Sequence, residues 1–478
     1  MSDNTLLTAA DVCQALDLTA SSLGIDGTTL SLPFSRVIVD SRQAVGGELF
    51  IALPGERCDG HEYVVAAMVA GARGAMVRAS KIDECRASLG RFASAPLFAV
   101  PDTLAGLQQL AAYWRRRFSL PVVAVTGSVG KTTTKEFVAS VLARRLSVHR
   151  SEGNRNNEIG LPLSLLQLNA RHQAMVLEMG TYGPGDIRQL CAVACPTIGI
   201  VTGVSWVHLE RMGSLEVIAA AKAELVEALP RTGTAILNAD DARVRAMAAM
   251  TAARVVYYGL SPQAAVRGSD VQPEGLRGVR FTMHLNGEAR PIHLLTPGRH
   301  QVINALAAAA VARELGMSVD EIVEGLEALH LEARLVTLPG VAGSLILDDT
   351  YNASPVSVLA SLDLLGDLEG RRIAVLGDMR ELGSFEDEGH RLIGERAART
   401  CDLLAVVGEK AALAGAAAVQ AGMDPSTVFF ALNNARAIDW LKPRLAPGDH
   451  VLVKGSRSMR LEEVVRAVAA ASGEAMQP

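Results

Sequence analysis

The stretch that most limits what this chain can fold into is VAVTGSVGKTTTKEF, residues 123–137. Residues typical of a buried strand run into a glycine-rich loop that ends in Gly130-Lys131-Thr132, and a helical pattern follows. Glycines let backbone N–H groups converge on phosphate oxygens, the helix N-terminus adds its positive end, and Lys131 adds a full charge. The hydroxyl of Thr132 suits a Mg²⁺ ligand. The predicted phosphate cradle consists of Thr126, Gly127, Ser128, Val129, Gly130, Lys131, Thr132 and Thr133.

One position departs from the standard phosphate-binding pattern. GxxxxGK[ST] requires glycine where this chain has Val125, so the match is to the shorter form TGxxGKT. A chance glycine-rich turn is the alternative, and the strand, the helix and the Lys-Thr pair argue against it. The loop alone does not distinguish a motor, a nucleotide switch, a kinase and an enzyme that activates a carboxylate.

Length and composition restrict the class of protein. A chain of 478 residues is too long to fold around a single hydrophobic core, so roughly two to four domains are expected. Hydrophobic residues make up 49% and charged residues 20%, which is typical of globular proteins. The net charge of −5 argues against nucleic acid as a partner. No apolar run reaches the ~20 residues of a transmembrane segment, and no signal-peptide pattern begins the chain. We therefore expect a cytoplasmic protein.

Three zones follow one another, and each predicts an α/β domain. Residues 1–118 alternate short apolar runs with Gly and Pro turns, which predicts a small N-terminal α/β domain. Residues 119–335 alternate apolar strands with helical stretches, which predicts a parallel sheet around the P-loop. Residues 336–478 contain the strands SLILDD, RRIAVLGD, DLLAVVGE and HVLVKGS, which predict a second, Rossmann-like doubly wound sheet.

Three residues of the middle zone are candidates for a metal site. Glu178 ends the apolar strand AMVLE, where a carboxylate is well placed for Mg²⁺, although a solvent-facing strand end is the alternative. Lys222 lies on the apolar stripe of a helix that starts at Ser214, and a buried unpaired ammonium is costly. A snorkelling lysine is the alternative there. His208, just before that helix, is a further candidate ligand, although a lone histidine is usually structural. The stripe comprises Leu215, Ile218, Leu225 and Leu229.

Three more residues are candidates for binding a nucleotide. Asn304 opens an apolar helix and is placed to read an adenine edge, although a polar residue in a first turn needs no such role. Arg334 lies where the second and third zones meet, and an arginine there can clamp phosphate on domain closure unless it is a surface residue. Asp349 lies in a loop at a strand end, a common position for ligand contacts.

Several stretches together resemble the Mur ligase family over essentially the whole chain. They are DSRQAVGGELFIALPGERCDGHEY, GNRNNEIGLPLSLL, LEMG, HLERMGSLEVIAAAKAE, LNADD, GRHQVINALAA, DDTYNASP, VLGDMRELG and LVKGSRSMRLEEVV. Members of this family are ATP-dependent enzymes that extend the peptide of the peptidoglycan precursor. The last three stretches most resemble the members that add a D-alanyl-D-alanine dipeptide.

The resemblance implies a role for each matching position. Residues 126–133 would cradle the ATP phosphates, with Lys131 catalytic. Thr132 and Glu178 would hold one Mg²⁺, and His208 would hold a second together with Lys222 as a carbamate formed from CO₂. Asn304, Arg334 and Asp349 would contact adenine, γ-phosphate and ribose. The resemblance assigns the sugar-nucleotide substrate to Ser41, Arg42, Asp59, Gly60, His61, Asn156 and Asn157.

The implied reaction is the synthesis of an amide. ATP would phosphorylate the terminal carboxylate of UDP-N-acetylmuramoyl-tripeptide, and the amine of D-alanyl-D-alanine would displace phosphate from the acyl phosphate. Two Mg²⁺ ions and Lys131 would offset the repulsion between the anions. The partners are thus small-molecule substrates, and a monomer is expected.

Three alternatives are open, two of them ligases and one from a different class of protein. A sister Mur ligase that adds the third peptide residue should carry an Asp-Asn-Pro-Arg motif, which residues 336–478 lack. A P-loop nucleotide switch should carry Asn-Lys-x-Asp for guanine, which is also absent from the sequence. A folylpolyglutamate-synthase-like ligase would not explain the DSR and DGH stretches of the first zone.

Overall fold

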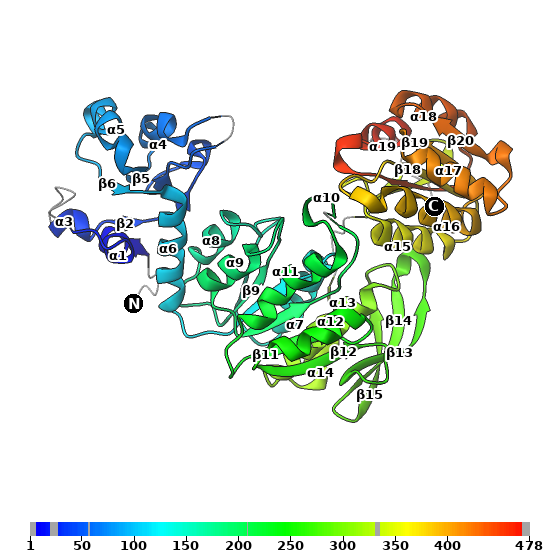
Figure 1. Ribbon diagram of the computed structural model, residues 1–478, viewed down its shortest axis with the longest axis horizontal. Helices are drawn as coiled ribbons and strands as arrows, with labels where there is room; N and C mark the ends of the chain where they lie inside the picture. Colours follow the sequence, from blue (N-terminus) through cyan, green and yellow to red (C-terminus); the bar gives the residue numbers. More distant parts are fainter. Residues whose placement is uncertain (1–5, 20–26, 56–57, 208, 330–334, 471–478) are drawn as a thin grey trace.

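The computed structural model describes residues 6–19, 27–55, 58–207, 209–329 and 335–470. They form three α/β units that follow one another along the chain, with the central unit between the other two (Figure 1). This agrees with the three α/β domains expected from the sequence, whereas the boundaries after residues 118 and 335 stay predictions. No helix within the described ranges is long and apolar enough to cross a bilayer.

The first unit contains two small sheets. β1 (Leu7–Thr8) and β2 (Pro33–Phe34) form an antiparallel pair. A four-stranded parallel sheet runs in the order β3 (Val37–Ile38), β4 (Leu49–Ile51), β5 (Gly74–Arg78) and β6 (Leu97–Val100). The helices are α1 (Ala9–Ala15), α3 (Gly27–Leu30), α4 (Val64–Val69), α5 (Ile82–Ser88) and α6 (Thr103–Arg116).

The central unit is built on a nine-stranded sheet. Its order is β15 (Glu288–Leu294), β14 (Val279–Leu285), β13 (Val266–Pro273), β12 (Arg254–Gly259), β11 (Thr234–Asn238), β10 (Ile198–Val201), β7 (Val122–Thr126), β9 (Ala174–Glu178) and β8 (Val148–Arg150). The parallel sheet predicted around the P-loop is present, and β13, β14 and β15 add an antiparallel meander at one edge that was not predicted. Short hairpin connections such as the Asn286-Gly287 turn favour antiparallel neighbours there.

Helices cover both faces of the central sheet. One face packs on α7 (Lys131–Leu142), α13 (Gln301–Glu314) and α14 (Val319–Glu327). The other packs on α8 (Gly160–Leu165), α9 (Asp186–Ala194), α11 (Leu215–Glu227) and α12 (Ala242–Ala246). The order in which successive strands join the sheet reverses at β7, which has β9 on one side and β10 on the other. In open α/β sheets a crevice for ligands forms at such a point, beyond the carboxyl ends of the strands.

The third unit is doubly wound, as predicted. Its sheet order is β16 (Val336–Pro339), β17 (Leu345–Asp348), β21 (His450–Lys454), β18 (Arg372–Gly377), β19 (Leu403–Val407) and β20 (Val428–Ala431). Only β16, at the edge, is antiparallel to its neighbour. One face packs on α15 (Pro355–Gly366), α16 (Glu386–Thr400) and α17 (Ala411–Gln420), and the other on α18 (Asn434–Leu441) and α19 (Glu462–Val468).

Helix α6 joins the first unit to the central unit. One hydrophobic core contains side chains from both, including Phe98 and Leu107 on one side and Leu161 on the other. The indole of Trp114 donates to Leu168 O at 3.0 Å. Buried Arg115 donates to the carbonyls of Ala194, Phe118 and Leu120 at 3.1, 2.7 and 3.3 Å. The first unit is therefore fixed to the central unit by a continuous core and by satisfied polar groups.

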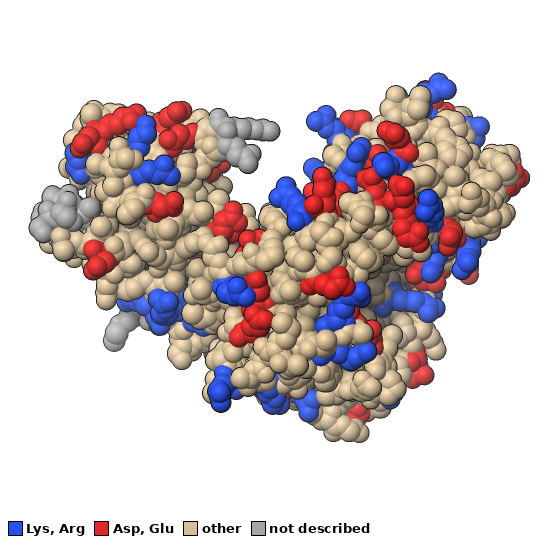
Figure 2. Space-filling view, viewed as in Figure 1, with Lys and Arg blue, Asp and Glu red and all other residues tan. Residues whose placement is uncertain are grey.

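The three units leave an open hollow on the face shown in Figure 2, between the first and the third units. Lys and Arg side chains are interspersed with Asp and Glu over that face, with no broad area of one sign (Figure 2).

Arg115→Ala should loosen the junction at α6. It leaves three carbonyls without their donor, and an unsatisfied buried acceptor costs about 1–3 kcal/mol. Urea denaturation followed by the fluorescence of Trp114, in a background with Trp206→Phe and Trp440→Phe, should show an earlier transition. The matched control is the exposed neighbour Arg116→Ala, expected within ~0.5 kcal/mol of wild type. Equal stability of the two variants would contradict the assignment of Arg115 to the junction.

Candidate functional site

The P-loop lies at the carboxyl end of the central strand β7, as the sequence predicts. All five residues of β7 are buried, and α7 begins at Lys131. Gly127 has φ +143°, and an added Cβ would lie 1.9 Å from Thr202 Oγ1. Gly130 has φ +86°, and an added Cβ would meet Asn304 Oδ1 at 2.8 Å. Glycine is required at both positions because of backbone conformation and close approach.

The loop is fastened to the segment that follows β10. Thr202 donates to Val129 O at 2.6 Å. The backbone N–H of Ser128 donates to Gly203 O at 2.9 Å, and its hydroxyl donates to Ser205 O at 3.2 Å. Ser205 N–H donates back to Ser128 Oγ at 2.9 Å. The loops after the neighbouring strands β7 and β10 are therefore held together by hydrogen bonds.

A carboxylate ends the adjacent strand β9. Glu178 is buried, and its two oxygens accept from different donors: Thr132 Oγ1 at 2.7 Å and Asn156 Nδ2 at 2.7 Å. The structure thus joins three residues that the sequence singled out, from β9, from α7 and from the loop before α8. The cluster presents oxygen atoms, which suit a hard cation such as Mg²⁺.

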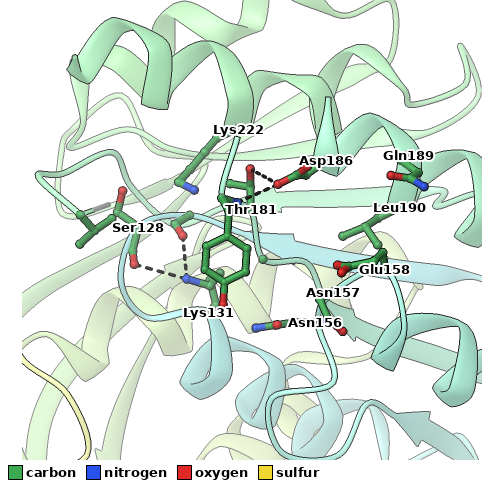
Figure 3. Close-up of a pocket in the computed structure, with 14 residues that line it drawn as sticks. Ser128, Lys131, Asn156, Asn157, Glu158, Thr181, Asp186, Gln189, Leu190 and Lys222 are labelled. Carbon is green, nitrogen blue, oxygen red and sulfur yellow. Dashed lines mark hydrogen bonds between the residues drawn. The ribbon is translucent and has the colours of Figure 1, made fainter. Parts of the chain in front are cut away.

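A cavity of about 270 Å³ opens at this edge of the sheet (Figure 3). Lys131 and Lys222 point into the same space from α7 and α11 (Figure 3). Lys131 Nζ donates to Gly127 O at 2.9 Å and to Ser128 O at 3.3 Å. The lining residues are Gly127, Ser128, Lys131, Asn156, Asn157, Glu158, Gly180, Thr181, Tyr182, Asp186, Gln189, Leu190, Val207 and Lys222.

Helix α11 holds Lys222 inside the protein. Ser214 caps the helix by accepting Val217 N–H at 3.3 Å, and the predicted stripe is buried. Glu224, two residues after Lys222, accepts Gly185 N–H at 2.6 Å and Arg188 N–H at 3.0 Å at the start of α9. Lys222 is 4% exposed, so the snorkelling alternative is wrong. Burial, and next the charge of Lys131, lower the pKa of Lys222 to about 7.

The loop after β9 forms one wall of the cavity, and the sequence analysis missed it. One carboxylate oxygen of Asp186, Oδ2, accepts Tyr182 N–H at 2.8 Å, Gly183 N–H at 2.9 Å and Thr181 Oγ1 at 3.4 Å (Figure 3). Tyr182 is 56% exposed and has the Arg211 guanidinium 5.2 Å from its ring centroid. The signal was present: TYGPGD begins after Met179 and Gly180, which follow the apolar strand that ends in Glu178.

Comparison with known proteins identifies the family. Models of the Mur ligase family catalytic domain, the Mur ligase middle domain and the Mur ligase glutamate ligase domain match residues 33–115, 125–312 and 333–457. UDP-N-acetylmuramoyl-tripeptide--D-alanyl-D-alanine ligase from Synechocystis is 36% identical over 445 residues, 93% of this chain and 94% of the relative. The chain belongs to the Mur ligase family.

Solved structures agree with this assignment. MurF from Acinetobacter baumannii superposes with a TM-score of 0.85 at 30% identity and covers 97% of this chain and 99% of its own. MurF from Thermotoga maritima, solved in complex with ADP, superposes with a TM-score of 0.76 at 29% identity. The match covers 90% of this chain and 96% of the Thermotoga chain.

Not every residue predicted for this Mur ligase reaches the cavity. Thr126 is fully buried and donates to Met179 O at 3.0 Å, so its hydroxyl supports the loop. Asn304 accepts from Thr134 Oγ1 at 3.1 Å and donates to Gln301 Oε1 at 2.9 Å, beside the P-loop. Its contact with adenine stays a prediction. Thr133 lies in the first turn of α7.

Asp349 belongs to the third unit and does not line the cavity. Its carboxylate accepts from Lys454 Nζ and from Ser361 Oγ, both at 2.6 Å, and the lysine is also buried. The predicted ribose contact is untested. His208 and Arg334 lie outside the described residues, so their predicted roles also stay predictions.

The sugar-nucleotide candidates divide between two units. Asn156 and Asn157 line the cavity, whereas the others lie in the first unit. Exposed Arg42 pairs with Asp40 at 2.7 Å. His61 is buried, its Nδ1 is 2.5 Å from Asp59 Oδ1, and its Nε2 accepts Arg78 N–H at 2.9 Å. Both ring nitrogens are occupied, which indicates that His61 shapes this loop. Ser41 and Gly60 begin short helical turns capped by Asp40 and Asp59.

Lys131→Ala should weaken binding of ATP by about 10- to 150-fold, because a hydrogen bond to a charged group contributes about 1.5–3 kcal/mol. Calorimetry with a non-hydrolysable ATP analogue measures this. Binding of UDP-N-acetylmuramoyl-tripeptide to the same variant is the internal control, since residues predicted to bind it lie mainly in another unit. Loss of both ligands together would indicate misfolding or a wrong division of the sites.

Proposed function

We propose that this Mur ligase joins D-alanyl-D-alanine to the terminal carboxylate of UDP-N-acetylmuramoyl-tripeptide, with ATP as the source of energy, in the synthesis of the peptidoglycan precursor. The observation that carries the proposal is the convergence of the P-loop and Lys222 on one cavity, beside which Glu178 accepts from Thr132 and from the lining residue Asn156. The names of the relatives that match the whole chain supply the substrates.

The chemistry needed here is activation of a poor electrophile. A carboxylate would have to lose oxide, so its phosphorylation to an acyl phosphate must precede attack by the amine. The P-loop N–H groups and Lys131 would bind the β- and γ-phosphates and bring the γ-phosphate to the carboxylate. The amine attacks only as the free base, and its pKa near ~8 makes that form accessible at neutral pH.

The residues at the site are consistent with Mg²⁺. Thr132 and Glu178 would hold the ion, whose charge would reduce the repulsion between carboxylate and phosphate. Within the described ranges no three His, Cys, Asp or Glu side chains form a cluster that could hold a metal. An ion with few protein ligands and several oxygens from water or phosphate is typical of Mg²⁺ rather than of zinc. A second ion, with His208 and Lys222, belongs to the same proposal.

Lys222 would act as a carbamate. Its amine is buried beside a second lysine, and with a pKa of about 7 a large neutral fraction exists at neutral pH. The lone pair of the neutral amine can add to the carbon of CO₂, one C–O π bond opens onto oxygen and one N–H proton is released, which leaves an anion with two oxygen atoms that can bind a metal. That change of sign turns the repulsion from Lys131 into attraction.

The proposed activity predicts a strict dependence on both substrates. Mass spectrometry should show the ligated product, with ADP and phosphate, only when UDP-N-acetylmuramoyl-tripeptide and D-alanyl-D-alanine are both present. Phosphate release without either substrate would indicate a nucleotide switch instead. Product from the UDP-linked dipeptide and a single amino acid would indicate the sister ligase.

Carbamylation predicts a pattern that a structural lysine would not give. Lys222→Ala should be folded and nearly inactive, and formate or acetate should restore part of the activity by replacing the anion. Lys222→Arg should stay inactive, since it keeps its charge and cannot form the carbamate. ¹³C NMR with ¹³CO₂ should show a carbamate signal only with Lys222 present. The signal should fall from pH 8 to pH 6, because the lowered pKa of about 7 means that protonation removes the reactive amine in this window. Normal turnover of Lys222→Arg would exclude the carbamate.

A further inference from the structure

An aromatic contact joins the third unit to the central unit, at the segment between β10 and α11. Trp206, after β10, stacks on Phe385 of η8 (Gly383–Phe385), with ring centroids 4.4 Å apart and an angle of 14°. Next to it, Glu210 N–H donates to Glu381 O at 3.3 Å. An added Cβ on Gly383 would approach Glu210 N at 3.2 Å, so the two backbones lie close together. The short helix α10 (Leu209–Met212) extends from the central unit toward the third (Figure 1).

Trp206 is linked to the cavity in both directions along the chain. Ser205, before it, exchanges hydrogen bonds with Ser128 of the P-loop, and Val207, after it, lines the cavity. Further on, a small apolar cluster leads into the helix that carries Lys222. Its buried members are Leu209, Met212, Leu215, Ile218 and Ala221, and Trp206 and Phe385 pack against them.

The loop that presents Phe385 is itself held firmly. His390, fully buried, accepts Met379 N–H on Nε2 at 3.0 Å and donates from Nδ1 to Glu386 O at 2.7 Å. One histidine thus ties both ends of the loop 379–386. Before the loop, Asp378 Oδ1 accepts Lys410 N–H and Ala411 N–H at 3.0 and 2.8 Å. A displacement of the third unit therefore moves Phe385 with it.

We propose that Phe385 is a positioning residue for the active site of the neighbouring unit. By stacking on Trp206 it holds residues 204–207 and, through the cluster at the start of α11, residues 209–212, and in this way it sets the spacing between the P-loop and Lys222. The position of the third unit is thereby transmitted to the site where the acyl phosphate forms. The kinetic part of this inference rests on the proposed ligase activity, whereas the contact and its link to the nucleotide do not.

Phe385→Ala should lower kcat by about 2- to 12-fold, the factor that corresponds to an aromatic pair. The KM for UDP-N-acetylmuramoyl-tripeptide should stay within about twofold, because residues predicted to bind it lie mainly in the first unit. Phe385→Tyr keeps the stacked ring and should keep wild-type kcat. Phe429→Ala is the matched control, since Phe429 stacks on Trp440 within the third unit, with centroids 5.1 Å apart. An equal loss of kcat in Phe429→Ala would overturn the proposal.

A second readout does not need turnover. In a Trp440→Phe background, the remaining tryptophans are buried Trp114 and half-buried Trp206. Acrylamide should quench Trp206 more strongly in Phe385→Ala than in Phe429→Ala. A non-hydrolysable ATP analogue should alter that quenching when Phe385 is present, and the response should shrink in Phe385→Ala. If the analogue leaves Trp206 unaffected, or if kcat is unchanged while quenching rises, the positioning role is wrong. Absence of product from wild type, with the quenching response intact, would instead refute only the ligase activity.

Discussion

Two lysines face one cavity of the central unit, and the constraint that they impose explains much of its architecture. Lys131 donates to the carbonyls of Gly127 and Ser128, and phosphate is its expected partner. Lys222 is buried among apolar side chains of α11, and burial lowers its pKa to about 7. Like charges at short range in a medium of low dielectric would otherwise repel strongly. Burial and the charge of Lys131 both lower the pKa of Lys222, which makes its neutral form more accessible than that of an exposed lysine and relieves the repulsion.

The order of the strands places these lysines together. Because β9 and β10 flank β7, the loops after all three strands open into the same crevice. Each loop then fastens to another: Glu178 holds Thr132, Thr202 holds Val129, and Ser128 holds Ser205. The resulting network is preorganised, so that a bound nucleotide would meet donors already in position. Preorganised donors contribute more than flexible ones, since they need no reorientation during the reaction.

The sequence predicted those parts of the site that are formed by one continuous stretch of the chain. The P-loop, the acid that ends β9 and the helix that starts at Ser214 each follow from the spacing of apolar residues and from glycine chemistry. Contacts between distant segments have no such pattern. The contact of Thr202 with Gly127, the three bonds to Asp186 Oδ2 and the stack of Trp206 on Phe385 depend on the strand order and on how the units pack. The meander β13–β15 was missed although its strands alternate buried with more exposed positions, a pattern typical of antiparallel strands with one solvated face.

The first and the third units are attached to the central unit by contacts of different extent, so they differ in how easily they can move relative to it. The first unit shares a continuous hydrophobic core through α6, and buried Arg115 and Trp114 bind carbonyls across the seam. The third unit contacts the central unit through small groups of side chains, such as Trp206 with Phe385 and Leu276 with the core beside α15. Interfaces of the second kind allow domain motion as the default. An acyl phosphate must be kept from water, and small contacts oppose a movement of the third unit less than the continuous core opposes a movement of the first. The asymmetry of the junctions thus makes the third unit the one suited to cover the reaction.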